Sequence, residues 1–223
     1  MSVLVVYVHG LWLNGWEAAW LRQRLSRELD CETHLFPYFS MTADLKANAR
    51  ALAGFLAQTH TDTLHLVGHS MGGPLILEFF EREVSADGLL ASGRPLTPGR
   101  IVLLGSPVRG SRAAQRLARL PYGRKLLGST ANELLLEPRE PHWSGARDLG
   151  VIAGEMAFGL GRLVGPFDAP NDGTVLVEET QQPGAKAQLT LHVTHSGLLF
   201  SAAVARQTAA FLREGRFAPV TTP

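Results

Sequence analysis

The chain has 223 residues, of which 45% are hydrophobic and 18% charged, and this composition excludes a disordered protein. Its length suits one folded domain, residues 1–223, and is short for two. The formal net charge of +1 gives no general attraction to nucleic acid or to an anionic membrane surface, so neither is expected as a partner.

The first residues carry no signal for export. The apolar run at 3–8 follows no basic start and stops at His9 and Gly10. No stretch approaches the roughly 20 apolar residues that a membrane span needs. With a single cysteine, Cys31, an intrachain disulfide is also excluded. These features predict a cytoplasmic protein without integral membrane association.

Apolar runs alternate with amphipathic stretches along the chain, which predicts a mostly parallel sheet of about six strands with helices on both faces. The valine-rich run at 3–8 suits a strand buried on both sides. The expected strands span 3–8, 34–38, 63–67, 100–104, 149–153 and 188–193. Helical spacing of apolar residues predicts helices near 16–29, 42–56, 74–80 and 198–212. The segment 85–99 is expected to be a surface loop.

The segment 107–147 is long and irregular, with helical spacing at 113–120 and 126–136. Long connections inside a domain are often functional, so we expect either a small lid-like insertion over a site or packing on the sheet edge. The segment is rich in charge and shows no sustained apolar stripe. A segment of this kind offers no wide apolar surface.

Residues 68–72 read Gly-His-Ser-Met-Gly, between the expected strand 63–67 and the helix near 74–80. A sharp turn in this setting exposes a serine oxygen above the sheet, and side chains at Gly68 or Gly72 would clash with nearby backbone. The positive end of the following helix favours a developing oxyanion. The sequence thus predicts Ser70 as a nucleophile.

A second turn follows the first strand at His9 and Gly10. It would aim the backbone N–H of Leu11 into the site, where it and the N–H of Met71 would form an oxyanion hole. His9 itself is expected to be structural. Trp12 and Leu198 are candidates for an acyl pocket, and for Trp12 ordinary packing is an equal alternative.

A serine nucleophile needs a base and a carboxylate that orients it. Among the histidines after Ser70, His142 lies in the irregular segment and His192 within the expected strand 188–193. His195 follows that strand, in the loop position from which a base can reach the serine. For the acid, Asp172 lies in a polar turn between two strands, Asp168 is the alternative, and Asp148 begins a strand at the wrong end.

These pieces together resemble the serine lipases and esterases of the α/β-hydrolase superfamily, above all small bacterial lipases without a large cap domain. The matching motifs are Val8-His9-Gly10, Val67-Gly68-His69-Ser70-Met71-Gly72-Gly73, Leu104-Gly105-Ser106-Pro107 with Gly110-Ser111, Asn171-Asp172-Gly173-Thr174-Val175 and His195-Ser196-Gly197-Leu198-Leu199. The resemblance implies the α/β-hydrolase fold, a nucleophile at Ser70, an acid at Asp172 and a base at His195.

The resemblance also implies hydrolysis of carboxylic esters through an acyl-enzyme. Thioesterase or amidase activity on the same residues is a close variant, and a binding scaffold without turnover is an alternative of another class. The expected partner is a small-molecule acyl ester. Because the segment 107–147 is rich in charge, we expect soluble esters with short or medium acyl chains to be preferred over emulsified lipid. No metal or organic cofactor is expected, because no ligand spacing or phosphate loop occurs in the sequence. The oligomeric state is not readable from the sequence.

Overall fold

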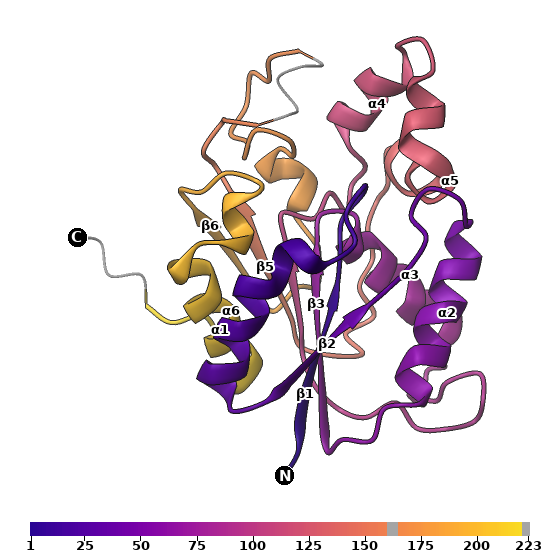
Figure 1. The fold of residues 1–223 in the computed structure, drawn as a ribbon, viewed down its shortest axis with the longest axis vertical. Helices are drawn as coiled ribbons and strands as arrows, with labels where there is room; N and C mark the ends of the chain where they lie inside the picture. Colours follow the sequence, from indigo (N-terminus) through magenta and orange to yellow (C-terminus); the bar gives the residue numbers. More distant parts are fainter. Residues whose placement is uncertain (160–164, 220–223) are drawn as a thin grey trace.

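The centre of the computed structural model, which describes residues 1–159 and 165–219, is a six-stranded sheet in the order β2-β1-β3-β4-β5-β6. All five neighbouring pairs are parallel, so the carboxyl ends of the strands share one edge (Figure 1). The prediction of a mostly parallel sheet of about six strands is confirmed. The strands are β1 Val3–Val8, β2 Glu32–Phe36, β3 Thr63–His69, β4 Ile101–Leu104, β5 Leu149–Gly154 and β6 Ala187–Leu191.

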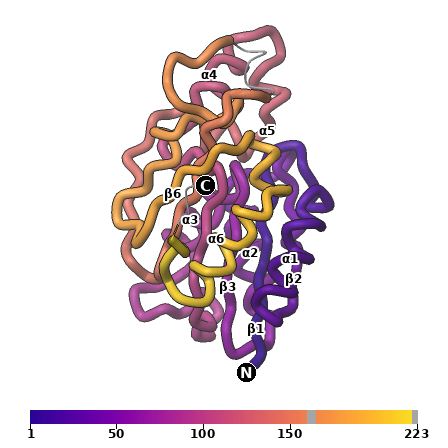
Figure 2. Tube along the Cα trace, turned by 90° about the vertical axis from the view of Figure 1, so that its left-hand side faces the viewer, coloured from indigo at the N-terminus to yellow at the C-terminus, as the bar shows by residue number. Residues whose placement is uncertain are grey.

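Helices cover both faces of the sheet, as the sequence predicts. The α-helices are α1 Ala19–Leu29, α2 Leu45–Ala57, α3 Gly72–Glu83, α4 Arg112–Ala118, α5 Gly123–Leu135 and α6 Ala202–Glu214. Figure 1 shows α1 and α6 on one side and α2 and α3 on the other. Short 3₁₀ turns are η1 Trp16–Ala18, η3 Val177–Thr180 and η4 Gly197–Leu199. Figure 2 looks onto the side bearing α6 and shows α4 at the end opposite the N-terminus.

The two cores follow from the alternation of side chains along each strand. In β1, Leu4, Val6 and Val8 pack with α2 and α3, whereas Val5 and Tyr7 pack with α1 and α6. This explains the unbroken apolar run at 3–8, because both faces of a central strand are buried. In the described part of the chain, no helix combines the length and apolar character that crossing a membrane requires.

Capping residues set several helix starts. Asp44 accepts the N–H of Ala47 at the start of α2 (2.6 Å), and Ser201 accepts the N–H of Val204 at the start of α6 (3.4 Å). The expected helix 198–212 is therefore two elements, η4 and α6. Likewise, the expected helix 16–29 is η1 followed by α1.

The placement of His192 within a strand is wrong. Strand β6 ends at Leu191, which pairs with Gly154 at the end of β5. Since β6 is an edge strand with β5 as its neighbour, its ladder ends where β5 ends. His192 consequently lies beyond the sheet with an exposed side chain.

His65 in β3 makes the stability of the fold depend on pH. Its Nδ1 accepts the backbone N–H of Arg100 at 3.0 Å, and the residue is buried. Burial, with the positive charges of Arg100 and Arg147, lowers the pKa of His65 to about 4. Because this is below the unfolded value, the contribution to stability is full above pH ~6.5 and is lost as pH falls toward 4.

We expect protonation of His65 in the unfolded chain to lower the free energy of unfolding by about 2 kcal/mol between pH 7 and pH 5. Urea unfolding at both pH values measures it. The His65→Asn variant retains an acceptor for the Arg100 N–H but does not titrate, so its stability should fall by correspondingly less. Equal losses in the two proteins would contradict the assignment.

Candidate active site

Ser70 lies in the turn that joins β3 to α3, at the carboxyl edge of the sheet. Its φ of 53° is in the left-handed region, which non-glycine residues rarely adopt. A Cβ at Gly68 would lie 2.8 Å from the Cα of Gly73, and one at Gly72 would lie 2.2 Å from the carbonyl oxygen of Val8. The predicted clash at both glycines is therefore confirmed, and the turn must be glycine-flanked.

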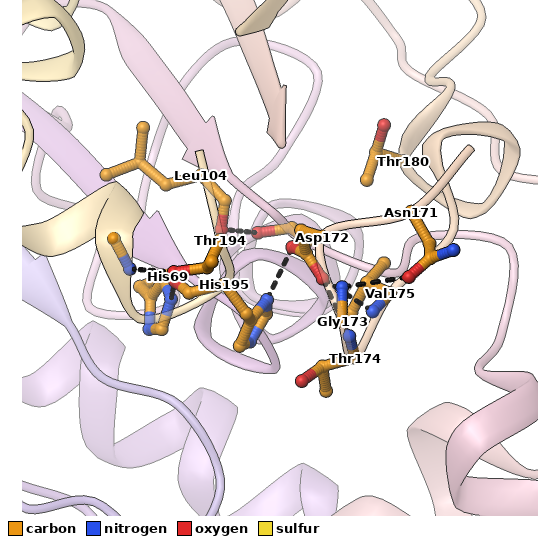
Figure 3. A network of polar contacts seen from close by, with 12 residues as sticks. His69, Leu104, Asn171, Asp172, Gly173, Thr174, Val175, Thr180, Thr194 and His195 are labelled. Atoms are coloured by element: carbon orange, nitrogen blue, oxygen red, sulfur yellow. Dashed lines mark hydrogen bonds and ion pairs between the residues drawn. The ribbon is translucent and has the colours of Figure 1, made fainter. Parts of the chain in front are cut away.

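A carboxylate and an imidazole meet beside this turn. His195 Nδ1 lies 2.6 Å from Asp172 Oδ2 (Figure 3). The other carboxylate oxygen of Asp172 accepts the backbone N–H groups of Thr174 (2.9 Å) and Val175 (2.7 Å), and the side chain is almost fully buried. The backbone N–H of His195 also donates to the backbone carbonyl of Asp172 at 2.8 Å. Together these hydrogen bonds hold the carboxylate and the imidazole in one orientation.

The other candidate acids and bases lie elsewhere. Asp168 is exposed, and Asp148 is at the opposite edge of the sheet, paired with Lys186 (2.8 Å) and Arg100 (3.2 Å). His142 is exposed in the segment before β5. The structure thus brings together Asp172 and His195 and does not bring the alternatives to them.

His69, which directly precedes Ser70, connects the two halves of this site. Its Nε2 lies 3.2 Å from the carbonyl oxygen of His195, and the two imidazole rings have centroids 4.8 Å apart. Burial lowers the pKa of His69 well below its ordinary value, so the ring is neutral and its Nε2–H donates. No role is predicted for His69 from the sequence, although its position beside Ser70 in the Gly-His-Ser motif is a signal for one.

The turn after β1 packs directly against the serine. A Cβ at Gly10 would lie 2.9 Å from the Cβ of Ser70. His9 stacks on Tyr38 at 4.2 Å between ring centroids, and the Tyr38 hydroxyl donates to the His9 carbonyl at 2.9 Å. His9 therefore holds the turn in place, which is the structural role the sequence predicts.

Comparison with known proteins assigns the chain to a family. The model of the alpha/beta hydrolase family matches residues 5–217. The chain belongs to the α/β-hydrolase family. A search of curated protein sequences gave no match.

Solved structures share the fold at low sequence identity. A Bacillus licheniformis lipase in its mature form is 17% identical with a TM-score of 0.66, covering 96% of this chain and 91% of the lipase. A Legionella pneumophila phospholipase is 16% identical (TM-score 0.66; 94% of this chain, 55% of the phospholipase). A metagenomic carboxyl esterase is 19% identical (TM-score 0.60; 87% and 64%). This α/β hydrolase thus spans about half to two thirds of the last two.

Gly105, at the end of β4, allows the acid and the imidazole to sit against the sheet. Its φ is +53°, and a Cβ there would lie 2.6 Å from Leu198 Cδ1, 3.0 Å from Asp172 Oδ2 and 3.2 Å from His195 Nδ1. Leu198 is fully buried and packs in the core below this contact. Any side chain at Gly105 would have to displace at least one of these three groups.

We expect Gly105→Ala to lower kcat/KM for hydrolysis by about 100-fold, because a shift of about 1 Å between reacting groups has this effect. The matched control is Gly93→Ala. Gly93 also has a positive φ (77°) but has nothing within 4 Å of the added Cβ. Both variants share the backbone strain, so a similar loss in both would show that the contact with Asp172 and His195 is unimportant.

The segment 107–147 of this α/β hydrolase is partly core and partly surface. Helix α5 has an apolar stripe that packs into the larger core, which corrects the expectation of no such stripe; its residues are Leu127, Ala131, Leu134 and Leu135. The Asn48 amide of α2 donates to Thr130 Oγ1 at 2.8 Å, which anchors α5. Trp12 is 53% exposed and donates from its indole N–H to the Leu126 carbonyl at 2.7 Å.

A metal site has no support in the described residues. Nowhere in residues 1–159 and 165–219 do three His, Cys, Asp or Glu side chains gather as potential ligands. The groups that face the site are a serine, two histidines and one carboxylate, which together suit proton transfer and nucleophilic attack.

Proposed function

We propose that this α/β hydrolase cleaves carboxylic esters of small molecules, with Ser70 as nucleophile, His195 as base and Asp172 as the orienting carboxylate. The observation that carries the proposal is the 2.6 Å contact between His195 Nδ1 and Asp172 Oδ2, held beside the turn of Ser70 by His69. The names of the lipase and esterase neighbours agree with an ester substrate.

The proposed chemistry follows from which nitrogen of His195 carries the proton. Because Nδ1–H donates to Asp172, Nε2 has a lone pair that accepts the proton of the Ser70 hydroxyl. The serine oxygen then attacks the ester carbonyl carbon, and the imidazolium returns its proton to the departing alkoxide. Water attacks the resulting acyl-enzyme by the same route and releases the acid.

The backbone N–H groups of Leu11 and Met71 are proposed to hold the oxyanion. Within the described residues neither amide has a backbone acceptor. Met71 directly precedes α3, whose N-terminal end carries partial positive charge. Amide donors that are fixed before the reaction stabilise the charge that develops on the carbonyl oxygen.

The proposed acyl contacts are Trp12 and Leu198. Trp12 offers an exposed indole face held by Leu126, whereas Leu198 lies in the core beneath His195 and Gly105. Between the two, Trp12 is the side chain that a substrate reaches without a rearrangement.

A fluorophosphonate probe tests the proposal, since it reacts with serines that an adjacent base has activated. We expect labelling of the native protein at Ser70, and no labelling of Ser70→Ala. Competition by p-nitrophenyl butyrate should protect the serine and release p-nitrophenol. A folded protein that neither labels nor hydrolyses this ester would support a binding scaffold instead.

A further inference from the structure

Exposed large hydrophobic residues are concentrated at one edge of this molecule. Among the described residues, all of them except Met1 lie in segments that leave the carboxyl end of a strand. The carboxyl ends form the edge of the sheet that also carries Ser70. Single exposed apolar residues are ordinary on a protein surface, but a gathered set marks an interaction site. We call this set the apolar rim; its members are Trp12, Trp16, Phe39, Leu120, Tyr122, Leu126, Met156, Phe158 and Phe200.

Three members of the rim lie in residues 119–126, which comprise the connection between α4 and α5 and the first turn of α5, and which we call the α4–α5 turn. Leu120, Tyr122 and Leu126 are 51%, 81% and 52% exposed. Tyr122 has a φ of 62°, and a Cβ at Gly123 would lie 1.8 Å from the Leu117 carbonyl oxygen, so the turn is tightly built. A tyrosine in this strained conformation presents its ring to solvent with a fixed backbone.

The same turn carries concentrated positive charge, although the whole chain has a net charge of only +1. From 109 to 132 the sequence has no acidic residue and six basic ones, Arg109, Arg112, Arg116, Arg119, Arg124 and Lys125. The first three have partners: Gln181, Glu178 and Pro166. In residues 1–159 and 165–219, Arg119, Arg124 and Lys125 form no ion pair, and all three are exposed.

We propose that the α4–α5 turn and the apolar rim dock this protein on an anionic lipid surface. Two features of such a surface suit these residues. Its anionic headgroups attract the basic side chains, and the interface between headgroups and acyl chains accepts the exposed Tyr, Trp and Leu side chains. The rim residues lie in segments that leave the carboxyl ends of the strands, the edge that carries Ser70, so docking would turn that edge toward the lipid. The docking itself depends on the exposed residues and not on the proposed hydrolysis.

The apolar part argues for lipid over other polyanions. Nucleic acid or an acidic peptide would use the charges of Arg119, Arg124 and Lys125, but it would leave Leu120 and Leu126 in water. A lipid surface buries both kinds of side chain at once. The two explanations therefore differ in whether removing apolar side chains weakens binding.

The test measures sedimentation of the Ser70→Ala protein with vesicles, so that no lipid is consumed. We expect it to bind vesicles of phosphatidylcholine with phosphatidylglycerol and to stay in solution with phosphatidylcholine alone. The combined variant Arg119→Gln, Arg124→Gln, Lys125→Gln should partition about 100-fold more weakly, since each cation near an anionic surface contributes several-fold. The variant Tyr122→Ser, Leu126→Ser should partition onto the vesicles at least about tenfold more weakly, although its charge is unchanged.

The matched control is Arg24→Gln, Arg27→Gln, Arg50→Gln, which removes three exposed cations from α1 and α2 and lowers the net charge equally. Its partitioning onto the vesicles should fall far less than that of the variant Arg119→Gln, Arg124→Gln, Lys125→Gln. Equal losses, or no binding to phosphatidylglycerol vesicles at low salt, would overturn the proposal. An unaffected Tyr122→Ser, Leu126→Ser variant would also overturn it, because the binding would then depend on charge alone.

The two proposals fail separately. With an intact Ser70, the variant Arg119→Gln, Arg124→Gln, Lys125→Gln should hydrolyse dissolved p-nitrophenyl butyrate at the native rate. Lost vesicle binding with retained ester hydrolysis supports docking through this turn. Retained hydrolysis with no vesicle binding by any protein overturns docking and leaves the proposed esterase standing.

Discussion

Replacement of Ser70 by alanine is expected to lower kcat/KM for p-nitrophenyl butyrate by about 10⁴-fold or more. On the proposed mechanism the variant loses the attacking oxygen, while His195 remains held by Asp172 and His69. Only the proposed oxyanion donors and substrate binding remain. Steady-state hydrolysis with the variant and native proteins measures the effect.

A matched control for this variant is Ser196→Ala. Ser196 is exposed, directly follows His195 and makes no capping hydrogen bond at the start of η4. Its loss should change kcat/KM by less than about threefold, since surface substitutions away from special features have small effects. A Ser70→Ala protein that retained most of the native activity would remove Ser70 from the mechanism.

The second large effect is expected from Asp172→Asn, with a loss in kcat of about 10⁴-fold. Both oxygens of Asp172 now act as acceptors, one from His195 Nδ1 and the other from the N–H groups of Thr174 and Val175. An asparagine keeps one acceptor and introduces an NH₂ group. If its oxygen stays with the two backbone amides, the NH₂ faces His195 Nδ1 and favours the tautomer whose Nε2 carries the proton.

With a proton on Nε2, the imidazole cannot accept one from Ser70, so the chemical step fails while substrate binding persists. The expected signature is a large fall in kcat with a much smaller change in KM. The control is Asp168→Asn in the same loop, where the carboxylate is exposed, and we expect an effect below about threefold. A larger effect at Asp168 than at Asp172 would reverse the assignment of the acid.

Local patterns determined much of this molecule. The valine run of β1 and the glycines around Ser70 each act on backbone within a few residues, so the sequence predicts their elements correctly. The end of the last strand was decided instead by its neighbour in the sheet. The sequence continues the last strand to Val193, but β6 stops at Leu191 because its partner β5 stops there.

The tertiary structure alone decided how the site is assembled. Asp172 and His195 are 23 residues apart, and His69 is 126 residues from His195, so their contacts depend on strand order and register rather than on local pattern. The need for glycine at Gly105 arises from side chains that two later loops bring against β4.

The surface shows the same division. Charge and apolar residues in the segment 107–147 are visible in the sequence, but their distribution between core and solvent is not. Folding buries the apolar stripe of α5 and leaves Leu120, Tyr122 and Leu126 exposed beside cations. The sequence by itself therefore determined the elements and the chemical groups of this α/β hydrolase, because these depend on nearby residues. Only the tertiary structure decided which groups meet and which face solvent, because that depends on packing between segments far apart in the chain.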